Sequence, residues 1–402
     1  MHVLQISDVY FPRVNGVSTS IETFRRGLIP HDVACTLIAP AYGNEPAQPG
    51  VVRVPGRAVP FDPEDRIARV GAMVRAARDC AAGGFDLVHV QTPFAAHFAG
   101  RRLARHWQVP LVISYHTLFE EYLHHYVPAA PRALTAALAR RMSRWQCGHA
   151  DRVIAPSSAM RERLRDYGVD TPIEVLPTGI PLGAFRGADG GRFRQAHGIA
   201  PERPVALTVS RLAHEKNIDF LVAAVDQARQ ACPALLLLVA GEGPAEAALR
   251  KQVAARGLHD HVRFLGYLER AQALPDCYAA ADLFVFASRT ETQGLVLLEA
   301  MASGTGVLAL SCMGTASILE TGCGCLTARD DVADFAARLA GCLSDRAQSH
   351  RLGLAARDGA AAWSDDAMAG RLAALYRGLL NESSIPSQRS SHWKARTRGR
   401  PA

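Results

Sequence analysis

The chain has 402 residues, of which 49% are apolar and 21% are charged, and its formal net charge is +7. This length is too great for one core of ordinary size, and this composition excludes a mainly disordered chain, so we expect two or three globular domains. No apolar run reaches about 18 residues, and the first residues lack the basic and apolar regions of a signal peptide. We therefore expect neither a membrane-spanning helix nor export by that route.

Nine cysteines are scattered through apolar segments without any CxxC pair. Such an odd, unpaired set is typical of reduced thiols, which predicts a cytoplasmic protein. The segment 381–402 is rich in basic residues and serine and poor in aliphatic residues, so we expect a disordered basic tail. The tail could contact an anionic membrane or only aid solubility. Its basic charge would also suit nucleic acid, but we do not expect a nucleic-acid partner.

Short apolar runs alternate with helical patterns along most of the chain. In the first half they predict strands at 2–6, 33–38, 87–90, 109–114 and 152–155. A stretch with Gly183, Gly187, Gly190 and Gly191 then predicts a linker, and further strands are expected at 205–209, 235–240, 262–265, 283–286 and 307–310. This alternation predicts an α/β fold with two doubly wound parallel sheets, whose ligands bind beyond the carboxyl ends of the strands.

Two loops at predicted strand ends carry glycine. Asn15 and Gly16 follow the first strand, where Gly16 could let the backbone approach a phosphate or could only start a helix, because Asn-Gly is also an ordinary turn dipeptide. Gly241-Glu242-Gly243-Pro244 follows the strand at 235–240. This tight turn would permit close backbone approach to a ligand, although simple turn chemistry explains it as well.

A basic loop follows the strand at 205–209, with the sequence Ser210-Arg211-Leu212-Ala213-His214-Glu215-Lys216-Asn217. Arg211 and Lys216 would emerge beside the start of the next helix. Two fixed cations there could neutralise a diphosphate and stabilise the charge that develops when it departs. The bland alternative is a solvated basic turn.

The segment 287–304 places two carboxylates, Glu291 and Glu299, around a predicted helix start that follows the strand at 283–286. Thr290 and Gln293 fit a capping box, so the helix should begin near 292–294, where its positive end would favour an anionic phosphate. Carboxylates near bound phosphates would repel them, so hydrogen bonds from neutral hydroxyls of a sugar and a ribose are the better expectation. The alternative is one solvated loop glutamate and one ordinary helix glutamate.

In this order the motifs resemble the retaining, nucleotide-sugar-dependent glycosyltransferases, a family that includes bacterial glycogen synthase, phosphatidylinositol mannosyltransferases and diacylglycerol glucosyltransferases. The resemblance covers roughly residues 1–380. It implies that Arg211 and Lys216 hold the diphosphate, that Glu291 contacts the donor sugar, and that Glu299 contacts the nucleotide ribose. It also implies that His116 lies near the reacting sugar, and that the other donor contacts come from Gly16, Gly241, Glu242, Gln293, Gly294 and Leu295. A lone histidine is otherwise more often a buried structural residue.

The resemblance implies the GT-B fold, in which two Rossmann-like domains face a central cleft. We expect an acceptor-binding domain at 1–182, a nucleotide-sugar-binding domain at 183–362, a helix at 363–380 that returns to the first domain, and the tail at 381–402. Two departures bear on the donor loop. Gly306 stands where a proline is common, and Met313-Gly314-Thr315 stands where paired glycines are usual.

We therefore expect transfer of a hexose from a UDP- or GDP-sugar to an acceptor hydroxyl. The chain has no Asp-x-Asp motif and no obvious enzymic nucleophile, so we expect retention, with the departing diphosphate taking the acceptor proton, and no metal or other cofactor. A sugar-nucleotide epimerase of the same fold and a non-catalytic sugar-nucleotide binder stay open. A glycoside hydrolase is disfavoured, because eight helical residues span about 12 Å and its carboxylates lie roughly 5 to 9.5 Å apart.

The acceptor is expected to be a membrane lipid such as diacylglycerol, or a glycan precursor. The segment 115–126 resembles the corresponding part of diacylglycerol glucosyltransferases. An apolar helical face lies beside four arginines, a pattern compatible with peripheral contact with an anionic membrane. The face comprises Leu134, Leu138, Met142 and Trp145, and the arginines are Arg132, Arg140, Arg141 and Arg144. The alternative is that this face packs on the core of the domain.

Overall fold

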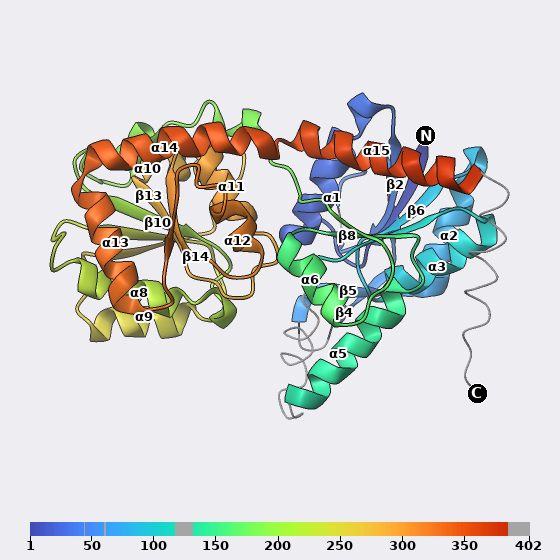
Figure 1. The fold of residues 1–402 in the computed structure, drawn as a ribbon, viewed down its shortest axis with the longest axis horizontal. Helices are drawn as coiled ribbons and strands as arrows, with labels where there is room; N and C mark the ends of the chain where they lie inside the picture. The colour runs from blue at the N-terminus through green and yellow to red at the C-terminus, as the bar shows by residue number, and fades with distance from the viewer. Residues whose placement is uncertain (44, 60–61, 117–131, 385–402) are drawn as a thin grey trace. The chain divides into compact units, whose positions relative to one another are not determined.

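The structure is a computed structural model that describes residues 1–43, 45–59, 62–116 and 132–384. The chain divides into two compact units. The first unit combines Met1–Gly179 with the chain from Asp365, and the second is Ile180–Ser364 (Figure 1). The chain therefore leaves the first unit a few residues before the expected boundary at 182/183 and returns to it two residues after the expected boundary at 362/363.

The first unit contains a seven-stranded parallel sheet in the order β3-β2-β1-β6-β7-β8-β9. Its central strands are almost wholly apolar and buried, as expected for a parallel sheet covered on both faces. The strands are β1 (His2–Ile6), β2 (Ala34–Pro40), β3 (Val51–Val54), β6 (Leu87–Val90), β7 (Leu111–Ser114), β8 (Arg152–Ala155) and β9 (Ile173–Val175). The antiparallel pair β4 (Gly56–Val59) and β5 (Asp62–Ala68) stands apart from this sheet.

The described helices of the first unit are α1 (Gly16–Gly27), α2 (Val70–Asp79), α3 (Ala95–Trp107), α5 (Arg132–Cys147), α6 (Ser158–Asp166) and α15 (Asp365–Ser384), with short turns η1 (Ile29–His31) and η2 (Ala81–Gly83). Helix α15 comes from the far end of the chain yet belongs to this core: Leu372 and Tyr376 are buried in one cluster with Val3 and Leu87 of the central strands. Figure 1 shows it beside α1. It runs four residues beyond the expected end at 380; the rest of the expected basic tail, 385–402, lies outside the described residues.

The second unit contains a six-stranded parallel sheet in the order β12-β11-β10-β13-β14-β15. Its strands are β10 (Val205–Val209), β11 (Leu236–Ala240), β12 (Val262–Gly266), β13 (Leu283–Phe286), β14 (Gly306–Leu310) and β15 (Cys325–Ala328). Its helices are α7 (Gly190–Ala196), α8 (Ile218–Ala228), α9 (Glu246–Ala255), α10 (Ala273–Ala280), α11 (Leu295–Ala302), α12 (Gly314–Leu319), α13 (Val332–Ser344) and α14 (Arg346–Ala360), with turns η3 (Leu182–Phe185), η4 (His214–Lys216) and η5 (Ala361–Trp363). A buried apolar cluster lies on each side of this sheet.

The expected glycine-rich linker is wrong. Turn η3 and helix α7 pack on the second unit, where Phe185 and Phe193 are buried in its core. Gly190 contacts α10 so closely that an added Cβ would lie 2.2 Å from the carbonyl oxygen of Ala279. Gly190 therefore serves helix packing and not flexibility.

Candidate active site

The order of the second sheet places β10 and β13 side by side at its centre. From β10 the chain continues outward through β11 and β12, and from β13 it continues the other way through β14 and β15. Such a reversal opens a crevice beyond the carboxyl ends of the two central strands, where α/β sheets bind their ligands. The basic loop that follows β10 and the Glu291 loop that follows β13 both start at this point.

Side chains join these two loops directly. Lys216 Nζ donates to Glu291 Oε2 at 2.6 Å, and both side chains are about four-fifths buried. Asn217 Nδ2 donates to the carbonyl of Ala287 at 3.0 Å, and Ser288 Oγ donates to the carbonyl of Glu215 at 3.1 Å. The structure thus brings together Lys216 and Glu291, which the sequence had placed 75 residues apart in two separate motifs.

Arg211 lies on the more exposed part of the basic loop. One of its terminal nitrogens lies 3.4 Å from Glu215 Oε1 in an ion pair that is nearly half exposed on both sides. An exposed pair of this kind contributes little stability. Arg211 could therefore exchange Glu215 for an anionic ligand at low cost.

The turn after β11 supports the basic loop. The N–H of Leu212 donates to the carbonyl of Glu242 at 2.9 Å, and a Cβ on Gly241 would lie 1.9 Å from the carbonyl oxygen of Ser210. Gly241 also has φ +125°, which L side chains rarely adopt. The chain's own packing thus requires Gly241. The exposed Glu242 side chain accepts from the N–H of Tyr267 at 3.3 Å, and contacts of either residue with a donor stay predictions.

Helix α11 begins at Leu295, one residue after the expected start near 292–294. Its N-cap is Gly294, with φ +94°, and no side chain caps it, so the capping box of Thr290 and Gln293 is wrong. A left-handed backbone at this N-cap suits glycine, which has no side chain to offer as a cap. The positive end of the α11 dipole still lies at the switch point, where Gln293 precedes the N-cap Gly294 and Leu295 is the first helical residue.

One of the two departures from the family pattern, Met313-Gly314-Thr315, contacts the Glu291 loop. The N–H of Gly314 donates to the carbonyl of Glu291 at 2.8 Å, and a Cβ on Gly314 would lie 2.2 Å from the backbone of Thr292. Met313 has φ 51° and ψ −126°, a backbone conformation that favours glycine. Met313 thus adopts a glycine-like backbone next to Gly314, although it is not a glycine.

Glu299 lies in the second turn of α11 and is only 4% exposed. Its Oε1 accepts from Arg270 at 2.5 Å, and its Oε2 accepts from the hydroxyl of Tyr278 at 2.9 Å. The charge of Glu299 raises the pKa of Arg270, and burial raises the pKa of Tyr278 well above its usual value. Sequence reasoning missed both partners. Arg270 could have been found because it follows the predicted strand at 262–265, as the other candidates follow theirs.

Two further candidates lie in the first unit. Gly16 is the first residue of α1, behind the Asn15 cap, whose side chain accepts from the N–H of Ser18 at 2.8 Å. Nothing in the described chain lies within 4 Å of the place where a Cβ on Gly16 would stand. His116 follows β7, and burial lowers its pKa to about 4, so its imidazole is neutral at physiological pH.

Asp8, which follows β1, holds the loop after β6 in place through hydrogen bonds. The carboxylate of Asp8 accepts from Thr92 Oγ1 at 2.7 Å, from the N–H of Phe94 at 3.2 Å and from the N–H of Ala96 at 3.1 Å. Burial raises the pKa of Asp8 to about 6, although these hydrogen bonds act in the opposite direction.

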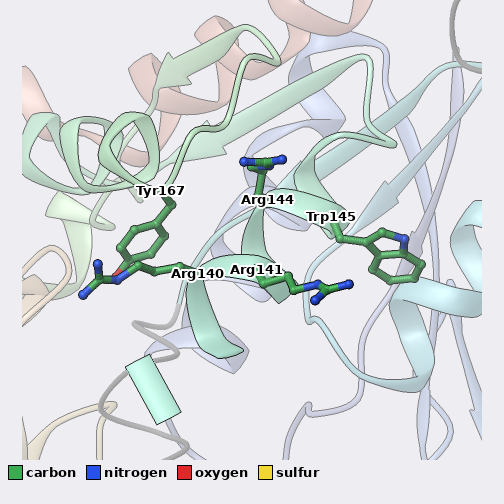
Figure 2. A pocket seen from close by; sticks show the side chains of 5 residues that line it. All are labelled: Arg140, Arg141, Arg144, Trp145 and Tyr167. Carbon is green, nitrogen blue, oxygen red and sulfur yellow. The ribbon is translucent and has the colours of Figure 1, made fainter. Parts of the chain in front are cut away.

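Helix α5 presents apolar side chains outward. Leu134 is 64% exposed, Leu138 56% and Trp145 42%, whereas Ala139 and Ser143 on the opposite face are fully buried. The apolar face, of which Met142 is half-buried, therefore does not pack on the core as the alternative supposed. Figure 2 shows a pocket beside this helix, lined by Arg140, Arg141, Arg144, Trp145 and Tyr167. The segment 117–131, most of the stretch that resembles diacylglycerol glucosyltransferases, lies outside the described residues.

The described part of the chain contains neither a membrane-spanning helix nor a cluster of potential metal ligands. None of its helices has the length and hydropathy needed to cross a bilayer. No group of three or more His, Cys, Asp or Glu side chains is arranged there to hold a metal ion.

Comparison with known proteins links both units to one class of enzyme. Residues 14–183 match the family described as Glycosyltransferase Family 4, and residues 190–359 match Glycosyl transferases group 1. Alpha-monoglucosyldiacylglycerol synthase of Streptococcus pneumoniae is 32% identical over 77% of this chain and 71% of its own length. The enzyme of the same name from Acholeplasma laidlawii is 27% identical over 77% of this chain and 80% of its own length.

Solved structures show the same fold. Sucrose-phosphate synthase from Thermosynechococcus elongatus has a TM-score of 0.78 at 22% identity and covers 95% of this chain and 100% of its own. Anabaena HepE in complex with UDP has a TM-score of 0.73 at 20% identity and covers 94% of this chain and 100% of its own. The two alpha-monoglucosyldiacylglycerol synthases, which are named for making a glucosylated lipid, disfavour the epimerase and the non-catalytic binder. The chain belongs to the GT-B glycosyltransferases that use nucleotide-sugar donors.

Proposed function

We propose that this protein transfers a hexose from a nucleotide-diphosphate sugar to the hydroxyl of a membrane lipid, with diacylglycerol as the first candidate. The observation that carries the donor half of this proposal is the pairing of Lys216 with Glu291 at the switch point of the second sheet. A cation and a carboxylate side by side suit a ligand that offers a diphosphate and sugar hydroxyls together.

The transfer proceeds with retention and without a metal ion. The bond between the anomeric carbon and the diphosphate breaks, a bond from that carbon to the acceptor oxygen forms on the same face, and the acceptor proton passes to the departing diphosphate. Arg211, Lys216 and the positive end of α11 stabilise the charge on the leaving group. Two relatives support retention by name, since an alpha-glucoside made from an alpha-linked nucleotide sugar keeps its configuration.

The other candidate side chains hold neutral parts of the substrates. Glu291 accepts from a hydroxyl of the donor sugar, and Glu299 accepts from the ribose while Arg270 and Tyr278 keep its carboxylate in place. His116, which is neutral because burial lowers its pKa to about 4, bonds a hydroxyl of the reacting sugar without adding charge. Gly16, Gly241 and Glu242 complete the donor contacts.

The acceptor half of the proposal rests on the exposed face of α5. Leu134, Leu138 and Trp145 are exposed. Phe98 of α3 is 48% exposed, and its ring is tilted against that of Trp145 with ring centroids 5.8 Å apart. Three arginines of α5 line one pocket with Trp145, as Figure 2 shows for Arg140, Arg141 and Arg144. Apolar side chains that enter the headgroup region, with arginines that attract anionic lipid, favour peripheral binding to a cytoplasmic membrane face.

A donor panel tests the proposal. The purified full chain is incubated with radiolabelled UDP- and GDP-sugars and with anionic vesicles that contain diacylglycerol, and label in the organic phase is measured. We expect label from one donor, an alpha-linked product by NMR, and unchanged activity in EDTA. Label that reaches only a soluble glycan would overturn the lipid acceptor, a beta-linked product would overturn retention, and loss of activity in EDTA would overturn metal independence.

A further inference from the structure

His116 is the outer end of a chain of buried hydrogen bonds that reaches helix α15. Its Nε2 lies 3.1 Å from Oε1 of Gln91, and Nε2 of Gln91 lies 3.2 Å from Nδ1 of His89. The same Nδ1 lies 2.6 Å from the hydroxyl of Tyr376 on α15, and Nε2 of His89 lies 2.8 Å from Oγ of Ser114. The four inner groups are all more than nine-tenths buried.

The protonation of this chain follows from its donors and acceptors. Burial lowers the pKa of His89 to about 3, so its ring is neutral and has one N–H and one lone pair. The amide N–H of Gln91 points at Nδ1, so Nδ1 carries the lone pair and Nε2–H donates to Ser114. The opposite end of the amide then accepts from Nε2–H of His116.

An amide has one donating end and one accepting end, so it couples its two neighbours. Whichever end of Gln91 faces His89, the other end faces His116. The tautomer of His89 therefore sets the tautomer of His116 through the orientation of a single side chain. Tyr376 also helps to set the tautomer of His89, because its hydroxyl, like the amide of Gln91, lies within hydrogen-bond distance of Nδ1 of His89.

The backbone around Gln91 is held firmly. Its N–H donates to the carbonyl of Ile6 at 2.9 Å, and the next residue, Thr92, bonds the carboxylate of Asp8 at 2.7 Å. Gln146 Nε2 of α5 donates to the carbonyl of Pro93 at 2.6 Å. A side chain on so fixed a segment can hold the orientation of a neighbouring ring, as the outer partners of reacting histidines do.

We propose that Gln91 is a positioning residue that fixes the tautomer and ring orientation of His116, and that Tyr376 of α15 fixes Gln91 in turn through His89. The role of Gln91 in catalysis rests on the proposed function, because it acts only if His116 contacts the reacting sugar. The last helix of the first unit thus takes part in the geometry of its candidate site.

The test combines NMR with kinetics on the full chain. Histidine ring ¹⁵N shifts report the tautomer directly, and the His116 signals are assigned by their loss in His116→Ala. Gln91→Met keeps the length of the side chain but removes both hydrogen bonds. We expect it to move the ¹⁵N shifts of His116 and to lower kcat about 10- to 100-fold through misplacement, with little change in the KM for donor.

Further variants separate positioning from simple stability. Gln91→Glu retains an oxygen for His116 and should recover part of the lost kcat. Tyr376→Phe keeps the packing of α15. It should shift the ring ¹⁵N signals of His89 more than those of His116. Tyr167→Phe, another buried tyrosine of the first unit outside this chain of bonds, should shift neither.

Non-additivity decides whether Gln91 acts through His116. In the His116→Ala background, Gln91→Met should cause no further loss of kcat. A second, multiplicative loss, or His116 signals that do not move in Gln91→Met and Tyr376→Phe, would overturn the proposal. If His116→Ala were fully active while the His116 signals moved in Gln91→Met, the positioning would stand and the proposed role of His116 would fail.

Discussion

Lys216 and Glu291 form a 2.6 Å ion pair that joins the loops after the two central strands of the second sheet. Each residue is also the one that the family resemblance assigns to a different part of the donor, the diphosphate for Lys216 and the sugar for Glu291. The pair keeps both side chains at the switch point and gives each a partner that a bound donor can replace.

Removal of the Lys216 charge should impair catalysis more than folding. We expect Lys216→Met to lower kcat/KM about 100- to 1,000-fold, because one fixed donor to a developing anion contributes on the order of 3 to 4 kcal/mol. The measurement is steady-state kinetics with the donor identified by the panel. Lys251→Met, on the exposed side of α9, is the matched control and should stay near wild type. Equal losses in both variants would contradict the assignment.

Glu299 should affect donor binding more than turnover. Glu299→Gln keeps the shape of the side chain but weakens the bonds from Arg270 and Tyr278, so we expect the KM for donor to rise about 10-fold while kcat stays within about 2-fold. Initial rates over a range of donor concentrations measure this split. Glu320→Gln, on an exposed position of the same unit, serves as control. A fall in kcat at constant KM would instead place Glu299 in the chemical step.

Gly16→Ala should affect folding stability and donor binding differently. A Cβ there meets nothing in the described chain, and alanine is the better helix former, so Gly16→Ala should leave the melting temperature unchanged or raise stability by up to about 1 kcal/mol. Calorimetry should nevertheless show weaker donor binding if a phosphate approaches this backbone. Gly71→Ala, near the start of α2 and equally uncrowded, should leave binding unchanged. Unaltered binding in Gly16→Ala would remove Gly16 from the site.

Asp8 should make stability depend on pH. Its folded pKa of about 6 lies above the ordinary value of 3.8, so the folded protein holds the proton more tightly than the unfolded chain does. This contribution is fully present below pH 3.8 and is lost as the pH rises toward 6, with a total of about 3 kcal/mol. Asp8→Asn has no titratable group at this position. Its melting temperature should therefore rise relative to that of wild type as the pH increases from 4 to about 6.5. A constant difference over that window would contradict the account.

The exposed face of α5 should carry membrane binding. We expect the double change Leu134→Gln and Leu138→Gln to weaken flotation with anionic vesicles by at least about 10-fold, because two exposed leucines lose their gain from burial. Leu354→Gln, on the similarly exposed Leu354 of α14, is the control. Activity on a water-soluble acceptor should be unchanged in all variants. Equal flotation of the double variant and wild type would exclude this face.

The sequence predicted the buried strands well, because short apolar runs between turns have few alternatives in an α/β chain. Strands β1, β6, β8, β10 and β13 have the expected bounds. Of the four edge strands in the two described parallel sheets, β12 was predicted, whereas β3, β9 and β15 were missed because they are only three or four residues long and only partly buried, and so lack that pattern. The linker was wrong because Phe185 and Phe193 bury this stretch in the core of the second unit, and because a glycine that permits close packing, such as Gly190, looks in the sequence like one that permits flexibility.

For the candidate site, the sequence indicated which loops carry the chemistry but not how their side chains pair. Lys216 and Glu291 meet only because β10 and β13 are neighbours in the sheet, and sequence order does not show that adjacency. Arg270 and Gln91 were missed for a similar reason: each acts through a partner on another element, Glu299 or His116. The capping box failed because Gly294 itself begins the helix.

Because α15 supplies buried side chains to the first unit, the order of synthesis and the order of folding differ. When the ribosome has made residues 1–179, the core around Val3 and Leu87 still lacks Leu372 and Tyr376. The second unit, Ile180–Ser364, is continuous in the chain and can complete its own core first. The core of the first unit therefore cannot be completed, and part of its apolar surface stays exposed, until residues 365–384 emerge. A nascent chain stalled before Asp365 should be a client of chaperones.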